Sequence, residues 1–189
     1  MSDDFSTLPR FVGLSGYARS GKDTVAAFLV AEYGYRQIAF ADRLRDLMVR
    51  VVALFPSVAE VLNAVGGDWD KAKEDPEVRR TLQSVRLAAR EHIEINVWIG
   101  ALLDVLEDER IVVSDLLFAN EAYAISTRGG TLFRIERPGT KPDDSHVSQT
   151  SLDHYDNFHA VLVNDSTFDV LYDRVRAAIH QRSLVSGGA

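Results

Sequence analysis

The stretch that most constrains this chain is residues 11–29, FVGLSGYARSGKDTVAAFL. It begins as a short apolar run, continues as a loop framed by Gly16 and Gly21, and passes through Lys22 into an apolar pattern typical of a helix. Glycines let backbone N–H groups curl around an anion, and a helix N-terminus adds the positive end of its dipole. This order of elements predicts a polyphosphate site in which Lys22 reaches the β- and γ-phosphates.

The spacing Gly16-x-x-x-x-Gly21-Lys22 fits the P-loop motif, but the next position departs from it. The motif has Ser or Thr there, whereas this chain has Asp23, and Thr24 follows one place later. We therefore expect Thr24 to provide the hydroxyl on the magnesium side, through water. The alternative is a Gly/Ser turn that leads into an ordinary helix, and the strand before the loop and the helix after it favour the phosphate site.

Composition excludes several other classes of protein. The 189 residues, 46% of them hydrophobic, predict one globular domain with a sizeable core. A net charge of −7 argues against a general binder of nucleic acid or of anionic membranes. The absence of cysteine excludes disulfides, thiolate zinc sites and a cysteine nucleophile. Because the sequence shows neither an apolar signal segment nor a run long enough to span a membrane, we expect a cytoplasmic protein.

Apolar runs alternate with helical patterns, which predicts an α/β layered domain with a parallel sheet. We expect the phosphate site at the carboxyl ends of its strands. The polar segment 68–75 is predicted to be a loop, and the helices within residues 57–106 are predicted to form a cap over the site. The expected strands are 11–15, 35–39, 110–114, 131–136 and 161–163, and the expected helices are 23–33, 42–55, 57–65, 76–92, 96–106, 120–127 and 167–181.

Asp115 follows an apolar strand, as a Walker-B carboxylate does when it orients magnesium or its water. A carboxylate that caps the following turn is the alternative. Residues 137–151 are rich in Pro, Gly, Ser and Asp, which predicts a loop. Such a segment can close as a lid with Arg134 and Arg137 at its edge, and an ordinary surface loop is the alternative.

The helix predicted at 76–92 carries a polar stripe beside its apolar stripe, with a helical spacing. The stripe consists of Arg79, Gln83, Arg86 and Arg90. Arginine suits bidentate contact with phosphate, so the stripe predicts a binding face for a phosphorylated molecule. A solvated basic face paired with nearby carboxylates is the alternative.

Over almost its whole length the chain resembles the bacteriophage deoxynucleoside monophosphate kinases, which belong to the P-loop nucleoside monophosphate kinase group. Five blocks carry the resemblance by their order and spacing: GLSGYARSGKDT (13–24), FADRLR (40–45), RRTLQ (79–83, with Trp98 further on), VVSDLLFANEA (112–122), and HVSQTSLD (146–153) followed by VLVNDSTFDVL (161–171). The resemblance implies a three-layer P-loop fold with a five-stranded parallel sheet, a helical insertion that binds the monophosphate, and a short lid. Two positions depart from the family: Leu117 stands where Arg is usual, and Gln149 stands where Glu is frequent.

The resemblance also implies a reaction, in which the γ-phosphoryl group of ATP passes directly to the 5′-phosphate of a deoxynucleoside monophosphate in the presence of Mg²⁺. A phage-encoded protein of this kind would work in the host cytoplasm. The implied ATP contacts are Gly16, Ala18, Arg19, Ser20, Gly21, Lys22, Asp23 and Thr24. The residues implied to act on the moving phosphoryl group are Lys22, Arg19, Asp42 and Arg137. Thr24 and Asp115 would orient Mg²⁺, and the acceptor would be bound by Arg45, Arg79, Gln83, Arg90 and Asp115.

Two other functions stay open at this stage. A kinase for another small acceptor, such as dephospho-coenzyme A, would keep the same P-loop, although the block at 79–83 argues against it. A non-catalytic nucleotide-binding protein would bind ATP and transfer nothing. Leu117 keeps this second alternative open, because binding needs fewer charges than stabilisation of the transfer. The sequence leaves the accepted base undetermined, and the apolar helix at 42–55 leaves a homodimer open.

Overall fold

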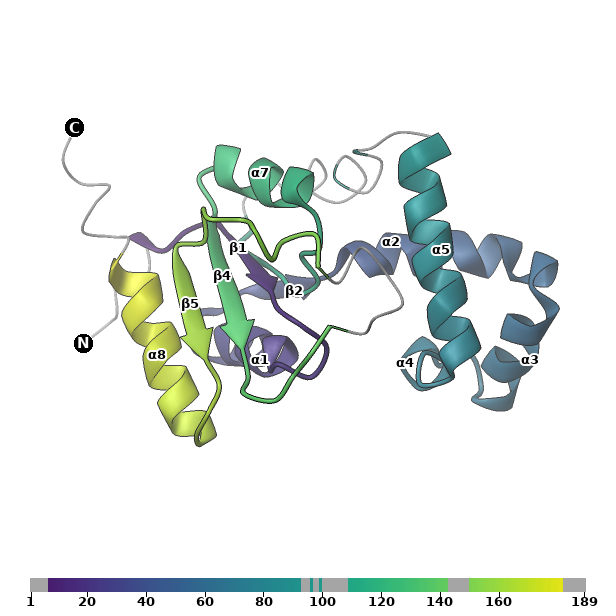
Figure 1. Cartoon of the computed structure of the whole chain (residues 1–189), viewed down its shortest axis with the longest axis horizontal. Helices are drawn as coiled ribbons and strands as arrows, with labels where there is room; N and C mark the ends of the chain where they lie inside the picture. The colour runs from purple at the N-terminus through teal and green to yellow at the C-terminus, as the bar shows by residue number, and fades with distance from the viewer. Residues whose placement is uncertain (1–6, 93–95, 97–98, 100–108, 143–149, 182–189) are drawn as a thin grey trace. The chain divides into compact units, whose positions relative to one another are not determined.

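The computed structural model describes residues 7–92, 96, 99, 109–142 and 150–181. The chain divides into two compact units, which are described one at a time below (Figure 1). The first unit comprises Met1–Ala39 and Glu107–Ala189, and the second comprises Phe40–Leu106. The cap is predicted to begin at residue 57, whereas the second unit begins at Phe40. The earlier start arises because helix α2 (Phe40–Val51) packs against helix α5 (Pro76–His92). Its action as a cap stays a prediction.

The first unit is built on a five-stranded parallel sheet with the strand order β2-β3-β1-β4-β5. The strands are β1 (Phe11–Ser15), β2 (Arg36–Ile38), β3 (Ile111–Val113), β4 (Thr131–Glu136) and β5 (Ala160–Val163). Strand β1 is central and pairs with β3 on one side and with β4 on the other. The predicted α/β fold with a parallel sheet is confirmed. The order of the strands reverses at β1, and in such sheets ligands bind beyond the carboxyl end of the strand at this point.

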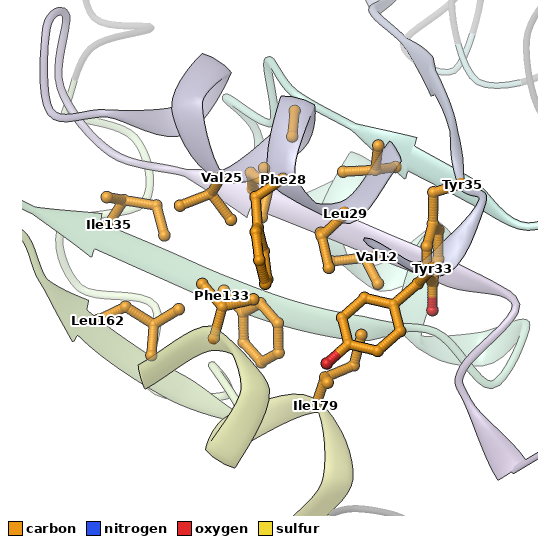
Figure 2. Close-up of a cluster of buried hydrophobic side chains, with 14 of the residues drawn as sticks. Val12, Val25, Phe28, Leu29, Tyr33, Tyr35, Phe133, Ile135, Leu162 and Ile179 are labelled. Atoms are coloured by element: carbon orange, nitrogen blue, oxygen red, sulfur yellow. The ribbon is translucent and has the colours of Figure 1, made fainter. Parts of the chain in front are cut away.

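Helices cover both faces of the sheet, with α1 (Lys22–Tyr33) and α8 (Phe168–Gln181) on one face and α7 (Ala119–Thr127) on the other (Figure 1). Side chains alternate between the two faces along each strand. Val12 and Phe133 belong to the core under α1 and α8, which Figure 2 shows. Gly13 turns to the face of α7, where an added Cβ would lie 3.0 Å from Ile125 Cδ1.

The second unit is helical. It contains α2, a 3₁₀ turn at Val52–Leu54, α3 (Pro56–Ala64), α4 (Trp69–Ala72) and α5. The prediction of a loop over 68–75 is therefore wrong at its centre. Asp68 caps α4 by accepting hydrogen bonds from the backbone N–H groups of Asp70 (2.9 Å) and Lys71 (3.2 Å). Helix α4 has only four residues, which is too short to show an apolar period. Its one signal in the sequence is the capping residue Asp68.

Most of the helix predicted at 96–106 lies outside the described residues, as do Gln149 and the middle of the segment 137–151. Among the residues that the structure describes, no single helix is long and apolar enough to cross a membrane. The helices Phe40–Leu54 and Pro56–Ala64 meet the length and composition criterion only jointly, across a bend of 113°. On α2 and the turn after it, Val49 is 62% exposed and Leu54 is 76% exposed. A homodimer through this surface stays a prediction.

Candidate functional site

The loop between β1 and α1 has the backbone expected of an anion-binding turn. Gly16 has φ 140° and Gly21 has φ 109°. Between them Arg19 has φ 64°, and it is the one non-glycine residue in the described part of the chain with positive φ. Residues that alternate between left-handed and right-handed conformations form concave nests, in which backbone N–H groups point towards an anion. The local backbone thus supports the phosphate site that the sequence predicts.

The two loop glycines are also required by close packing. A Cβ on Gly16 would lie 2.2 Å from the backbone oxygen of Ile135, and a Cβ on Gly21 would lie 2.5 Å from Asn164 Nδ2. Asn164 is buried, and its Nδ2 donates a hydrogen bond of 2.9 Å to the backbone oxygen of Ser20. Sequence reasoning gave Asn164 no role. The available signal was a polar side chain directly after a strand, at the sheet edge where the loop lies.

Lys22 is folded back over its own loop. Its Nζ donates to the backbone oxygens of Gly16 (2.7 Å) and Tyr17 (2.8 Å). An ammonium group carries three N–H donors, so a third remains for a ligand. Burial lowers the pKa of Lys22, and the negative charges of Asp23 and Asp115 act in the opposite direction. A phosphate bound beside Lys22 would raise this pKa again, because an opposite charge favours the ammonium form.

The other predicted loop residues differ in exposure. Ala18, Arg19 and Asp23 are exposed and Thr24 is half-buried. Ser20 is only 1% exposed, and within the described part of the chain its Oγ has no hydrogen-bond partner. Ser20 therefore contributes mainly backbone groups to the loop, whereas Arg19 carries a charge at its exposed side.

Asp115 follows β3, beside the central strand whose end carries the loop. Its charge acts on Lys22, which agrees with a Walker-B position. The carboxylate of Asp115 and the hydroxyl of Thr24 are the oxygen donors that Mg²⁺ prefers. Over the described ranges there is no group of three or more His, Cys, Asp or Glu residues that could hold a metal.

In the second unit, Asp42 and Arg45 come together within an ion-pair network. Arg45 contacts Asp42 at 3.3 Å and Asp70 at 3.0 Å, and Lys73 contacts Asp70 at 2.7 Å. A phosphate held by Arg45 would have to share its guanidinium with these two carboxylates. Arg79 is exposed, and its Nε donates to the backbone oxygen of Lys73 at 3.3 Å. Arg79 is thus the more accessible of the two arginines.

The polar stripe of α5 changes from exposed to buried along the helix. Gln83 is half-buried, and its Oε1 has no hydrogen-bond partner among the residues that the structure describes. Arg86 is only 6% exposed, and its guanidinium lies 5.8 Å from the centre of the Phe40 ring. Arg90 is half-buried. Solvent exposure, as in the alternative of a solvated basic face paired with carboxylates, therefore applies to Arg79 and not to Arg86. The predicted site residues form two groups, one in each unit.

Near the end of β4, the two arginines predicted at the lid edge differ. Arg137 is exposed, whereas Arg134 forms an ion pair with Asp153 at 2.7 Å. Arg134 is therefore held by this carboxylate in the described structure. Leu117, at the position where the family usually has Arg, donates its backbone N–H to Glu121 Oε2 at 3.0 Å. Glu121 also accepts from the backbone N–H of Phe118, at 3.1 Å, at the start of α7.

No protein-family model matches the chain. A protein of Acanthamoeba polyphaga mimivirus, named "Putative deoxynucleotide monophosphate kinase", is 27% identical over 194 residues, which cover 91% of this chain and 97% of that protein. Shikimate kinase from Aquifex aeolicus has a similar structure, with a TM-score of 0.51 and 16% identity over 94% of this chain and 99% of that one. TT1252 from Thermus thermophilus gives a TM-score of 0.47 and 19% identity over 92% and 98% of the two chains. The match to shikimate kinase shows the fold alone, an α/β layered domain on a five-stranded parallel sheet.

Proposed function

We propose that the chain is a deoxynucleoside monophosphate kinase, which transfers the γ-phosphoryl group of ATP to the 5′-phosphate of a deoxynucleoside monophosphate and yields the diphosphate and ADP. The observation that carries the proposal is the ammonium group of Lys22, oriented by two carbonyls of the glycine loop after the central strand. The mimiviral relative supports the class of acceptor, because its similarity extends over nearly all of both chains.

The proposed reaction needs no protein nucleophile, because catalysis of phosphoryl transfer consists of positioning and neutralisation of charge. The loop amides and the third N–H of Lys22 would hold the donor phosphates. Arg19, on the exposed side of the loop, and Arg137, after β4, would neutralise charge on the moving group. Thr24 and Asp115 would hold Mg²⁺, and the ion would supply positive charge to the donor phosphates.

The acceptor would be bound by residues of the second unit. Arg79 is exposed and suited to a bidentate contact with the monophosphate. Arg45 and Arg90 would add positive charge, and Asp42 would orient the acceptor or a water on the metal. The amide oxygen of Gln83 accepts no hydrogen bond from any described residue, and it is suited to accept one from a base.

The experiment that tests the proposed function uses the full chain with Mg²⁺, ATP and each of dTMP, dGMP, dAMP and dCMP. We expect ADP and the matching diphosphate to form with one or more of them, measured by chromatography of the nucleotides. Dephospho-coenzyme A serves as a competing acceptor in the same assay. Turnover of dephospho-coenzyme A alone, or binding of ATP without any transfer, would overturn the proposal in favour of one of the two alternatives.

Replacing Arg79 with Ala is expected to raise the KM for the monophosphate by about tenfold or more, because a charge-assisted hydrogen bond contributes ~1.5–3 kcal/mol. The KM for ATP should change little. The matched control is Arg80→Ala, since Arg80 is the next residue on the same helix, equally exposed and outside the polar stripe. Initial rates at varied monophosphate concentration, and separately at varied ATP concentration, give the two constants. An unchanged KM for the monophosphate would remove Arg79 from the acceptor site.

A further inference from the structure

A cluster of three side chains joins the phosphate-binding loop to a turn far away in the sequence. Tyr17 lies in the loop, and its phenol donates a hydrogen bond of 2.7 Å to Asp153 Oδ2. The other oxygen of the same carboxylate accepts from Arg134 at 2.7 Å. Arg134 also donates to the backbone oxygen of Leu152 at 3.0 Å. We call Tyr17, Arg134 and Asp153 the Asp153 clamp.

The clamp is packed as well as hydrogen-bonded. The guanidinium of Arg134 lies 5.3 Å from the centre of the Tyr17 ring and 5.9 Å from that of Phe158. The side chain of Arg134 is 11% exposed and that of Asp153 is 23% exposed. Charge-assisted hydrogen bonds that are shielded in this way are stronger than those of exposed pairs. The bond to Asp153 also raises the pKa of Tyr17, which keeps its phenol protonated as a donor.

The turn that carries Asp153 is fastened at a second point. The hydroxyl of Ser151 donates to the backbone oxygen of Leu117, which lies two residues after Asp115. The turn is thus held to the loop after β1 and to the segment after β3. These two segments carry Lys22 and Asp115, the candidate charges of the phosphate site. Because the turn contacts both segments, the position of Asp153 is fixed relative to Tyr17.

The position of Tyr17 matters because its backbone helps to orient Lys22. The ammonium group of Lys22 is held by the carbonyls of Gly16 and Tyr17. Rotation of the Tyr17 backbone would move both carbonyls, since the two peptide planes meet at its Cα. The neighbouring Gly16 resists such rotation least, because glycine has the widest conformational freedom. The hydrogen bond from the Tyr17 side chain to Asp153 therefore supplies a restraint that the backbone next to Gly16 cannot provide by itself.

We propose that Asp153 is a positioning residue for the phosphate-binding loop, which holds Tyr17 so that Lys22 points its third N–H at the donor phosphates. This inference rests on the proposed function only in that the loop binds a nucleotide. The acceptor is not part of it. Without the clamp, the loop would lose conformational freedom at the moment of binding, and the nucleotide would bind more weakly.

The test compares Tyr17→Phe, Asp153→Asn and the double variant with the wild type, and Tyr123→Phe is the control. Tyr123 is 68% exposed on α7, outside the proposed binding machinery. Calorimetric titration with Mg·ADP gives the Kd, and initial rates give kcat and the KM for ATP. We expect each single clamp variant to raise the Kd by about fivefold to thirtyfold and to lower kcat. The Kd of the double variant should be little higher than the Kd of the single variant that binds Mg·ADP less tightly, because both changes disrupt the same cluster.

Thermal unfolding of every variant separates positioning from stability. A merely structural clamp would lower the melting temperature and leave the Kd, kcat and KM measured well below that temperature unchanged, and this result would overturn the inference. Additive effects of the two changes on the Kd would also contradict it. If the wild type binds Mg·ADP and phosphorylates none of the four monophosphates, the proposed acceptor is wrong, and the Kd values still decide the role of Asp153. A wild type that binds no Mg·ADP would overturn both.

Discussion

Replacing Lys22 with Ala is expected to lower kcat/KM for phosphoryl transfer by about a thousandfold or more, while the chain stays folded. The ammonium group is the one cation that the loop itself orients, through the backbone oxygens of Gly16 and Tyr17. Its loss removes a preorganised charge from the place where negative charge accumulates during the transfer. The other cation of the loop, Arg19, has an exposed side chain.

Folding should be much less sensitive to this change. The variant leaves two carbonyls without their donor, which costs about 1–3 kcal/mol, but it also removes an ammonium group whose charged form is disfavoured by burial. Initial-rate kinetics and thermal unfolding by circular dichroism check the two parts separately. Lys71→Ala is the control, because the side chain of Lys71 is 68% exposed and lies outside both the loop and the predicted lid. Transfer activity within a few-fold of the wild type would refute the assignment of the loop.

The second large effect is expected for Gly16→Ala, which should abolish measurable binding of Mg·ADP and lower the free energy of unfolding by about 3 kcal/mol or more. Gly16 has φ 140°, which an L side chain rarely adopts, and its added Cβ would lie 2.2 Å from the backbone oxygen of Ile135. The backbone oxygen of Ile135 is fixed within strand β4 and cannot move away as the end of a flexible side chain can. The loop itself must therefore move, and the cradle for the phosphates moves with it.

Gly34→Ala is the matched control for this variant. Gly34 also has positive φ, at 69°, but nothing lies within 4 Å of an added Cβ. Its replacement should cost only the strain of a left-handed residue, about 1–2 kcal/mol. Urea unfolding monitored by circular dichroism gives both free energies. Equal losses for the two variants would show that the close approach to Ile135 is not what requires glycine at position 16.

Local patterns predicted the elements that depend on neighbours in the sequence. The apolar run before Gly16 and the glycine after the first helix, Gly34, placed β1 and α1 within a residue of their observed bounds. The same reasoning failed at α4, because a helix of four residues is too short to show a period. Periodicity also grouped Arg79 with Arg86 on one stripe, whereas the first is exposed and the second is buried. Spacing defines a face of a helix, but only packing decides what covers it.

The sequence by itself determined that a glycine loop with the spacing of the P-loop motif follows an apolar strand and that the strands lie parallel. Both follow from short-range patterns of glycine, charge and apolar residues. The tertiary structure alone decided what holds the loop in shape. Asn164 bonds to Ser20 across 144 positions, and Asp153 bonds to Tyr17 across 136. Such pairs leave no period or spacing in the sequence, because the fold brings the turn that carries Asp153 and the residue that follows β5 to the loop after β1.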